Sequence, residues 1–258
     1  MIDSHCHLYF DSFNGNRDQL IADAIKAGVE KIINIGIDLE SSRQCIELAE
    51  QHENLYATVG VHPHDAKTFS RSVLREFKIM AQHPRVVAIG EIGLDFYRDN
   101  SPRPVQREVF RQQLELAVET KLPVVIHSRE SFDECLTIIQ EFATDLVGGV
   151  FHCFPGDVDD AERAIELGFV LGIGGVATFK NSAMSRVATH APLESIILET
   201  DAPFLAPVPF RGQTNQPAYV RQVCERIAEL KKVSFSEVEK VTSLTCSKLF
   251  GLAETFEG

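Results

Sequence analysis

The chain has 258 residues, of which 44% are apolar, so it can form one large α/β domain with a sizeable core. Its net charge of −12 argues against a broad basic surface of the kind that binds duplex nucleic acid. It has no apolar run near the ~20 residues that cross a bilayer, no secretory signal pattern and no Cys-x-x-Cys pair, so we expect a cytoplasmic protein with reduced thiols, no membrane association and no obligate protein partner.

Eight apolar, β-rich runs recur along the chain, and helical patterns fill most of the intervals between them. Strands that alternate with helices indicate a parallel sheet. Eight such units predict a distorted (β/α)8 TIM barrel that spans residues 1–258 as a single domain. The predicted strands are Met1–His7, Lys31–Ile37, Tyr56–His62, Val86–Glu91, Pro123–His127, Gly149–His152, Phe169–Gly175 and Ser195–Asp201.

The helical patterns end with two segments that follow the last predicted strand. These extra C-terminal helices are expected to close the barrel or to cover its outside. The loop 204–218 before them is rich in Pro and Gly, and we interpret it as an active-site loop. The predicted helices are Arg17–Ala27, Ser41–His52, Val105–Thr120, Ser131–Phe142, Asp159–Leu167, Asn181–His190, Pro217–Leu230 and Ser236–Phe250.

Two histidines, His5 and His7, lie at the end of the first predicted strand. Side chains two residues apart share a strand face, so both imidazoles can reach one metal ion. Two ordinary histidines would produce the same pattern. The position at a strand end favours metal binding, and Asp3 could orient one of the imidazoles.

Four more ligand-type residues follow apolar runs: Glu91, His127, His152 and Asp201. The carboxyl ends of barrel strands meet at one face, so all six side chains are expected to converge there. A buried glutamate needs a partner; a salt bridge would supply one, but Glu91 bridging two cations explains the set better. Asp201 could bind metal through one oxygen and take a proton from a bound water through the other.

Weaker signals surround this set. His62 and His64 end the third strand, Arg129 lies two residues past His127, and Arg211 and Asn215 lie in the late loop. Each of these side chains could hold an oxyanion of a substrate. A role at the surface or in bracing a loop is nearly as consistent with the sequence.

Six segments together resemble the TatD family of metal-dependent deoxyribonucleases, within the amidohydrolase-type barrels. The resemblance runs from residue 1 to about residue 250, and the six motifs together are highly specific. They are Ile-Asp-Ser-His-Cys-His at 2–7, Gly-Val-His-Pro-His-Asp at 60–65, Ala-Ile-Gly-Glu-Ile-Gly-Leu-Asp-Phe-Tyr at 88–97, Pro-Val-Val-Ile-His-Ser-Arg at 123–129, Phe-His-Cys-Phe at 151–154 and Glu-Thr-Asp-Ala-Pro-Phe-Leu at 199–205.

The resemblance implies two divalent ions at the C-terminal face of the barrel, with magnesium or manganese for activity and zinc as a further candidate. One ion would be held by His5, His7 and Asp201, the other by His127 and His152, and Glu91 would bridge them. His62, His64 and Arg129 match positions that contact substrate phosphate in the family. The family's Asn-Glu-Pro-Ala reads Asn-Gln-Pro-Ala at 215–218 here, which puts the contacts of that loop in doubt.

Three functions remain open at this stage. The leading hypothesis is a divalent-metal-dependent hydrolase that cleaves phosphodiester bonds of DNA as a 3′-5′ exonuclease on single-stranded ends. The alternative is an amidohydrolase-type enzyme that hydrolyses an amide, ester or phosphoester in a small molecule, although no lysine ends the fourth or fifth strand to bridge the metals. A non-catalytic scaffold with a degenerate site is disfavoured by the intact ligand set.

Overall fold

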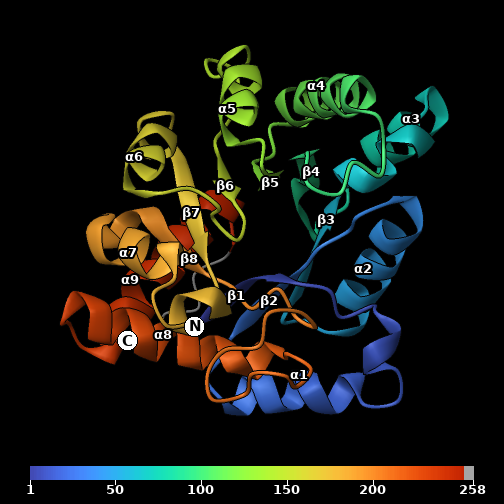
Figure 1. The fold of residues 1–258 in the computed structure, drawn as a ribbon. Helices are drawn as coiled ribbons and strands as arrows, with labels where there is room; N and C mark the ends of the chain where they lie inside the picture. The colour runs from blue at the N-terminus through green and yellow to red at the C-terminus, as the bar shows by residue number, and fades with distance from the viewer. Residues whose placement is uncertain (253–258) are drawn as a thin grey trace.

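The computed structural model describes residues 1–252, so the last six residues of the predicted domain 1–258 lie outside the described part. Eight parallel strands form one sheet in the order β1 to β8, as predicted, with helices around them (Figure 1). A parallel bridge between Cys6 and Ala202 joins the last strand to the first. The amide of His7 also donates to the carbonyl of Ala202 at 2.8 Å, so the sheet closes into a barrel.

All eight strands begin within one residue of their predicted starts, and seven of them end within three residues of the predicted ends. The exception is the fourth, which runs four residues past its predicted end at Glu91. The strands are β1 Ile2–Cys6, β2 Lys31–Asn34, β3 Leu55–Val59, β4 Val86–Asp95, β5 Val124–Arg129, β6 Gly149–Phe151, β7 Phe169–Ile173 and β8 Ile196–Leu198.

All eight predicted helices are present, and the structure adds α3 between β3 and β4. The helix α3 was not among the predicted elements, although Ser70 caps it by accepting from the amide of Val73 and its buried face includes Phe77. None of the described helices is both long and apolar enough to span a bilayer. The helices are α1 Arg17–Lys26, α2 Leu39–Gln51, α3 Arg71–Met80, α4 Arg103–Thr120, α5 Phe132–Gln140, α6 Val158–Glu166, α7 Ala183–His190, α8 Val220–Lys231 and α9 Phe235–Phe250.

The inside of the barrel is filled by apolar side chains from the strands, and α9 closes its amino-terminal end. Phe250 of α9 packs in one buried cluster with residues such as Ile2 and Val150. The helix α8 packs against α7 and α9 on the outside. The two extra C-terminal helices therefore divide the predicted tasks, since α9 closes one end and α8 covers the wall.

The close approach of β4 to β5 places Glu91 of β4 beside His127 of β5 at the centre of the barrel mouth. Gly93 has a φ of 137° and pairs with His127, and a Cβ at this glycine would collide with the carbonyl oxygen of His127. Only glycine fits such a backbone conformation and such a contact. The pairing register of the two strands shifts between Ile89 and Ile92. As a result, Glu91 lies inside β4 rather than at its end, with its carboxylate beside His127.

Candidate metal centre

The first part of the site comes from β1. His5 and His7 are both buried, and their Nε2 atoms lie 3.2 Å apart. The Nδ1 atom of His7 lies 3.0 Å from the carbonyl oxygen of Ile35, so in the neutral ring it donates there. The Nε2 atom of His7 then carries a lone pair directed into the cavity, as metal coordination requires.

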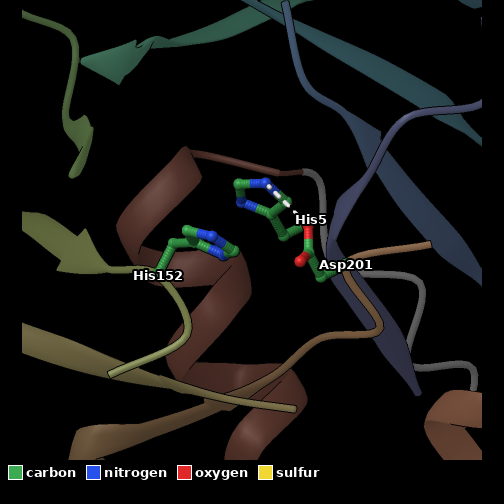
Figure 2. Close-up of side chains that lie close together, drawn as sticks. All are labelled: His5, His152 and Asp201. Carbon is green, nitrogen blue, oxygen red and sulfur yellow. Dashed lines mark ion pairs between the residues drawn. The ribbon is translucent and has the colours of Figure 1, made fainter. Parts of the chain in front are cut away.

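Asp201 joins this pair from the turn that follows β8. Its Oδ1 atom lies 3.5 Å from Nε2 of His7 and 3.7 Å from Nε2 of His5. Its amide donates to the carbonyl of His5 at 2.8 Å, which ties the turn to β1. The residue has a φ of 58°, a left-handed conformation that aspartate adopts more readily than most residues. Figure 2 shows Asp201 and His5 facing one another, with His152 beside them.

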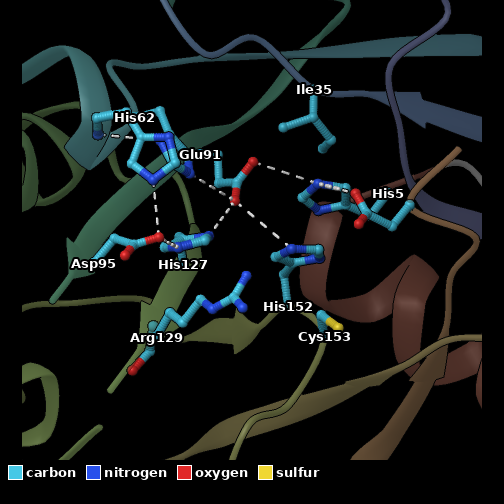
Figure 3. Close-up of polar contacts among 12 residues, drawn as sticks. His5, Ile35, His62, Glu91, Asp95, His127, Arg129, His152 and Cys153 are labelled. Atoms are coloured by element: carbon cyan, nitrogen blue, oxygen red, sulfur yellow. Dashed lines mark hydrogen bonds and ion pairs between the residues drawn. The ribbon is translucent and has the colours of Figure 1, made fainter. Parts of the chain in front are cut away.

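Glu91 lies at the centre of the cluster and is 3% exposed. Its Oε2 atom faces His5 at 3.5 Å and His7 at 4.0 Å. Its Oε1 atom faces the other side, toward His127, and the dashed contacts in Figure 3 radiate from this carboxylate to imidazoles on both sides. The two oxygens of one carboxylate thus serve two separate groups of histidines, which is the geometry of a bridging ligand.

Three histidines surround the Oε1 atom of Glu91. Nδ1 of His127 lies 2.8 Å away, Nε2 of His62 lies 3.5 Å away and Nε2 of His152 lies 3.6 Å away. His62 was predicted to bind substrate, yet its Nε2 atom lies as near to this oxygen as that of His152. The described residues thus contain three ligand groups that could hold a cation: His5, His152 and Asp201; His5, His7 and Glu91; and His62, Glu91 and His127.

Two further carboxylates, neither of which was predicted to have a role, contact the imidazoles on the side away from Glu91. Oδ2 of Asp95 lies 3.0 Å from Nε2 of His127 and 2.8 Å from Nε2 of His64. Oε1 of Glu199 lies 3.2 Å from Nδ1 of His152. Carboxylates in this position fix the orientation of metal-binding imidazoles and raise their basicity. The extension of β4 past Glu91 is what brings Asp95 to the site.

The predicted role of Asp3 is wrong. Its carboxyl group accepts from the main-chain amides of His5 and Thr200 and from the hydroxyl of Thr200 at 2.6 Å, and it contacts no imidazole. Burial raises the pKa of Asp3 to about 8, although the hydrogen bonds from Thr200 oppose the shift. Asp3 therefore joins β1 to the segment after β8 and places the backbone from which His5 and Asp201 extend.

These groups open into one cavity of about 360 Å³ at the carboxyl-terminal end of the barrel. The volume is at the small end of the ~300–1,000 Å³ that is usual for ligand sites. The lining residues are His7, Phe10, Ile37, His62, His64, Asp65, Glu91, Asp95, Arg98, His127, Arg129, His152, Asp201 and Phe204.

Comparison with known proteins identifies the family. Residues 2–251 match the family model described as TatD related DNase. This chain belongs to the TatD family.

Individual relatives agree with this assignment. The chain is 39% identical to the "Uncharacterized metal-dependent hydrolase YabD" of Bacillus subtilis, across 97% of this chain and 98% of that protein. It is 32% identical to the "3'-5' ssDNA/RNA exonuclease TatD" of Klebsiella pneumoniae, across 98% of each. The crystal structure of YJJV, a TatD homologue from Escherichia coli, superposes with a TM-score of 0.93 at 33% identity, across 98% of each chain. The protein is therefore a metal-dependent hydrolase.

The electrostatics of the TatD centre fit a cationic occupant. Burial opposes ionisation of Glu91 and Asp201, yet the surrounding imidazoles, including His152, hold the pKa of both carboxyl groups below its usual range. Burial would lower the pKa of His152, but Glu199 and Glu91 raise it to about 10. The buried carboxylates thus require positive charge beside them, and divalent ions can supply that charge in place of protons.

At two other imidazoles of the TatD centre, the effect of burial outweighs that of the neighbouring carboxylate, Glu91. Burial lowers the pKa of His62 to about 4 and also lowers that of His5, with repulsion from neighbouring histidines adding to both shifts. Both rings are therefore neutral near pH 7. A neutral imidazole is the form that binds a metal ion, so the donor set suits divalent cations that accept nitrogen and oxygen ligands.

In the late loop, Phe204 lines the cavity, whereas Arg211 and Asn215 do not. The guanidinium of Arg211 stacks over the ring of Phe179, 3.7 Å from its centroid, and Arg211 does not line the cavity. Asn215 is fully buried, and its side-chain amide donates to the carbonyls of Thr200 and Phe204. Asn215 therefore braces the TatD loop. The three residues that were predicted to contact substrate phosphate, His62, His64 and Arg129, line the cavity.

Proposed function

We propose that this protein hydrolyses phosphodiester bonds of DNA, as a 3′-5′ exonuclease acting on single-stranded ends. The proposal rests on the position of the Glu91 carboxylate between two groups of histidines. One of its oxygens faces His5 and His7, and the other faces His127. Such an arrangement suits two divalent ions, for which magnesium or manganese is proposed, with zinc as the alternative. When bound, the two ions supply electrostatic stabilisation for the attacking and leaving oxygens of an in-line displacement.

The protein side chains are proposed to carry the remaining steps. Asp201 accepts a proton from the attacking water, whose oxygen forms a bond to phosphorus while the bond from phosphorus to the leaving oxygen breaks. The leaving oxygen keeps the electron pair of that bond and takes up a proton from solvent. His64 and Arg129 hold non-bridging oxygens of the phosphate, and His62 either shares this task or binds the second ion. Arg211 would reach the substrate only if the late loop moved, because it now stacks on Phe179.

Two features favour a strand end over the interior of a duplex. The cavity of about 360 Å³ is small, and the net charge of −12 disfavours an extended basic surface along a duplex. A cytoplasmic location is part of the proposal, because all six cysteines are free thiols. The name of the relative from Klebsiella pneumoniae, "3'-5' ssDNA/RNA exonuclease TatD", also favours a single-stranded end as the substrate.

The decisive experiment is time-resolved cleavage of end-labelled single- and double-stranded DNA and RNA by chelator-treated protein to which each cation is added back. We expect loss of single nucleotides from the 3′ end of single-stranded DNA. Asp201→Asn should abolish cleavage and leave the circular dichroism spectrum unchanged, whereas Asp145→Asn, an exposed aspartate, should have no effect. Cleavage of amides or lactones with no cleavage of oligonucleotides would instead support the small-molecule hydrolase.

A further inference from the structure

One side of the cavity mouth is a wall of two phenylalanines. Phe10 follows β1 and Phe204 follows β8, and their rings meet edge to face with centroids 5.5 Å apart. Both rings also lie against His7, at 5.5 Å for Phe10 and 6.3 Å for Phe204. The two phenylalanines therefore adjoin the ligand group formed by His5, His7 and Glu91.

Phe204 is 48% exposed, yet its backbone is held firmly. Its amide donates to the carbonyl of Asp201 at 2.8 Å, and its carbonyl accepts from the side chain of Asn215 at 2.6 Å. Because Asn215 is fully buried, the loop cannot easily turn Phe204 into the core. A large apolar ring is thus kept in water at the edge of a polar cavity, where an occupant with an apolar face would cover it.

The other side of the mouth is cationic. Arg98 and Arg129 line the cavity, and both guanidinium groups lie over the ring of Tyr97, at 5.5 and 4.0 Å from its centroid. Within residues 1–252, neither guanidinium forms an ion pair with a carboxylate. On α4, by contrast, Arg103 and Arg111 each pair with one. Figure 3 shows Arg129 on the side of the cluster where His127 and His152 lie.

We propose that Phe10 and Phe204 form a stacking subsite for the base of the 3′-terminal nucleotide, and that Arg98 and Arg129 hold the phosphates that precede it. The inference rests on the proposed nuclease function and adds a direction to it. The terminal nucleoside lies on the His7 side of the ions, and the strand leaves over the arginines. An aromatic face accepts every base, so the subsite selects unpaired ends without selecting sequence.

A terminal abasic substrate isolates the stacking contact. We compare a single-stranded oligonucleotide with the same oligonucleotide that ends in a tetrahydrofuran abasic nucleotide, using full-length protein loaded with Mn²⁺. Stacking is worth ~1–3 kcal/mol per base, so Phe204→Ala should raise KM for the intact end about 10-fold. The same variant should leave KM for the abasic end unchanged, because no base is present to stack.

Three variants complete the design. Phe204→Tyr should keep the wild-type KM, since its ring can still stack. Val208→Ala is the matched control, because Val208 lies in the same loop, is also 48% exposed and does not line the cavity. Arg98→Ala should raise KM equally for both substrates and reduce the salt dependence of binding, because the phosphates are present in both.

The outcomes separate this inference from the proposed function. An unchanged KM for Phe204→Ala on the intact end, or an equal rise on both ends, would overturn the stacking subsite while leaving the nuclease function in place. Wild-type protein that cleaves neither oligonucleotide would overturn the nuclease function and the subsite together. A rise confined to the intact end, absent in Phe204→Tyr and Val208→Ala, supports the subsite.

Discussion

The two ends of the barrel are made by the same eight strands and serve different purposes. At the amino-terminal end, Phe250 of α9 packs with Ile2 and Val150 in a buried apolar cluster. At the carboxyl-terminal end, Glu91 and Asp201 lie among imidazoles, and burial opposes their charge. Apolar burial stabilises the first end, whereas desolvated charges weaken the second unless cations bind there. The contrast indicates that stability and chemistry can be changed separately.

Replacing Glu91 with Gln should be the most damaging change at the mouth. The variant loses the charge that both ligand groups share, so kcat/KM should fall at least ~100-fold, since even partners that only orient metal ligands are worth ~10–100-fold. Steady-state kinetics and metal content after purification measure the effect. Glu108→Gln, an exposed site on α4, is the matched control. Wild-type turnover in the Glu91 variant would refute the bridging role.

Replacing Phe250 with Ala should produce the converse result at the opposite end. Phe250 is 4% exposed, and its removal leaves a cavity in the apolar cluster. We expect a loss of ~3–5 kcal/mol in the free energy of unfolding, which lowers the Tm by roughly 10 °C for a chain of this size. Urea unfolding and kcat at 20 °C test this prediction. A large fall in kcat of the folded variant would show that the two ends are coupled.

Removing the metal should lower stability by a smaller amount. Ions that bind only the folded protein stabilise it by ~2.7 kcal/mol per site when their free concentration is 100 times the Kd. A chelator should therefore lower the Tm by about 5–10 °C per site, and the shift should be the same in Phe250→Ala. Differential scanning calorimetry with and without chelator provides the measurement. A Tm that does not respond to chelation would argue against cation binding at the mouth.

Replacing Glu199 with Gln should have the smallest of the four effects. Glu199 contacts Nδ1 of His152 but is not itself in any of the three ligand groups. Loss of such an orienting carboxylate weakens metal affinity by ~10–100-fold, while the fold and the ligand set are retained. Titration calorimetry of the chelator-treated protein with Mn²⁺ gives the Kd directly. Unchanged affinity would mean that packing alone orients His152.

Much of the fold was predictable because the barrel repeats one local pattern. An apolar run that ends in a polar residue predicts a buried strand with a polar side chain at its carboxyl end. All eight predicted strands were confirmed. The helix α3 was missed, although Ser70 and Phe77 give it a cap and a buried face. The positions of Asp3 and Arg211 could not be predicted from such a local pattern. Asp3 accepts a hydrogen bond from Thr200, 197 residues away, and the guanidinium of Arg211 stacks over the ring of Phe179.

The sequence by itself determined the class of the site: histidines and carboxylates at the ends of parallel strands meet wherever a barrel closes, whatever the loops do. Only the tertiary structure decided which atoms face one another. The extension and register shift of β4 divide the oxygens of Glu91 between two groups and bring Asp95 behind His127. Barrel closure sets Phe10 beside Phe204. These contacts depend on strand register and long-range packing, which no local pattern encodes.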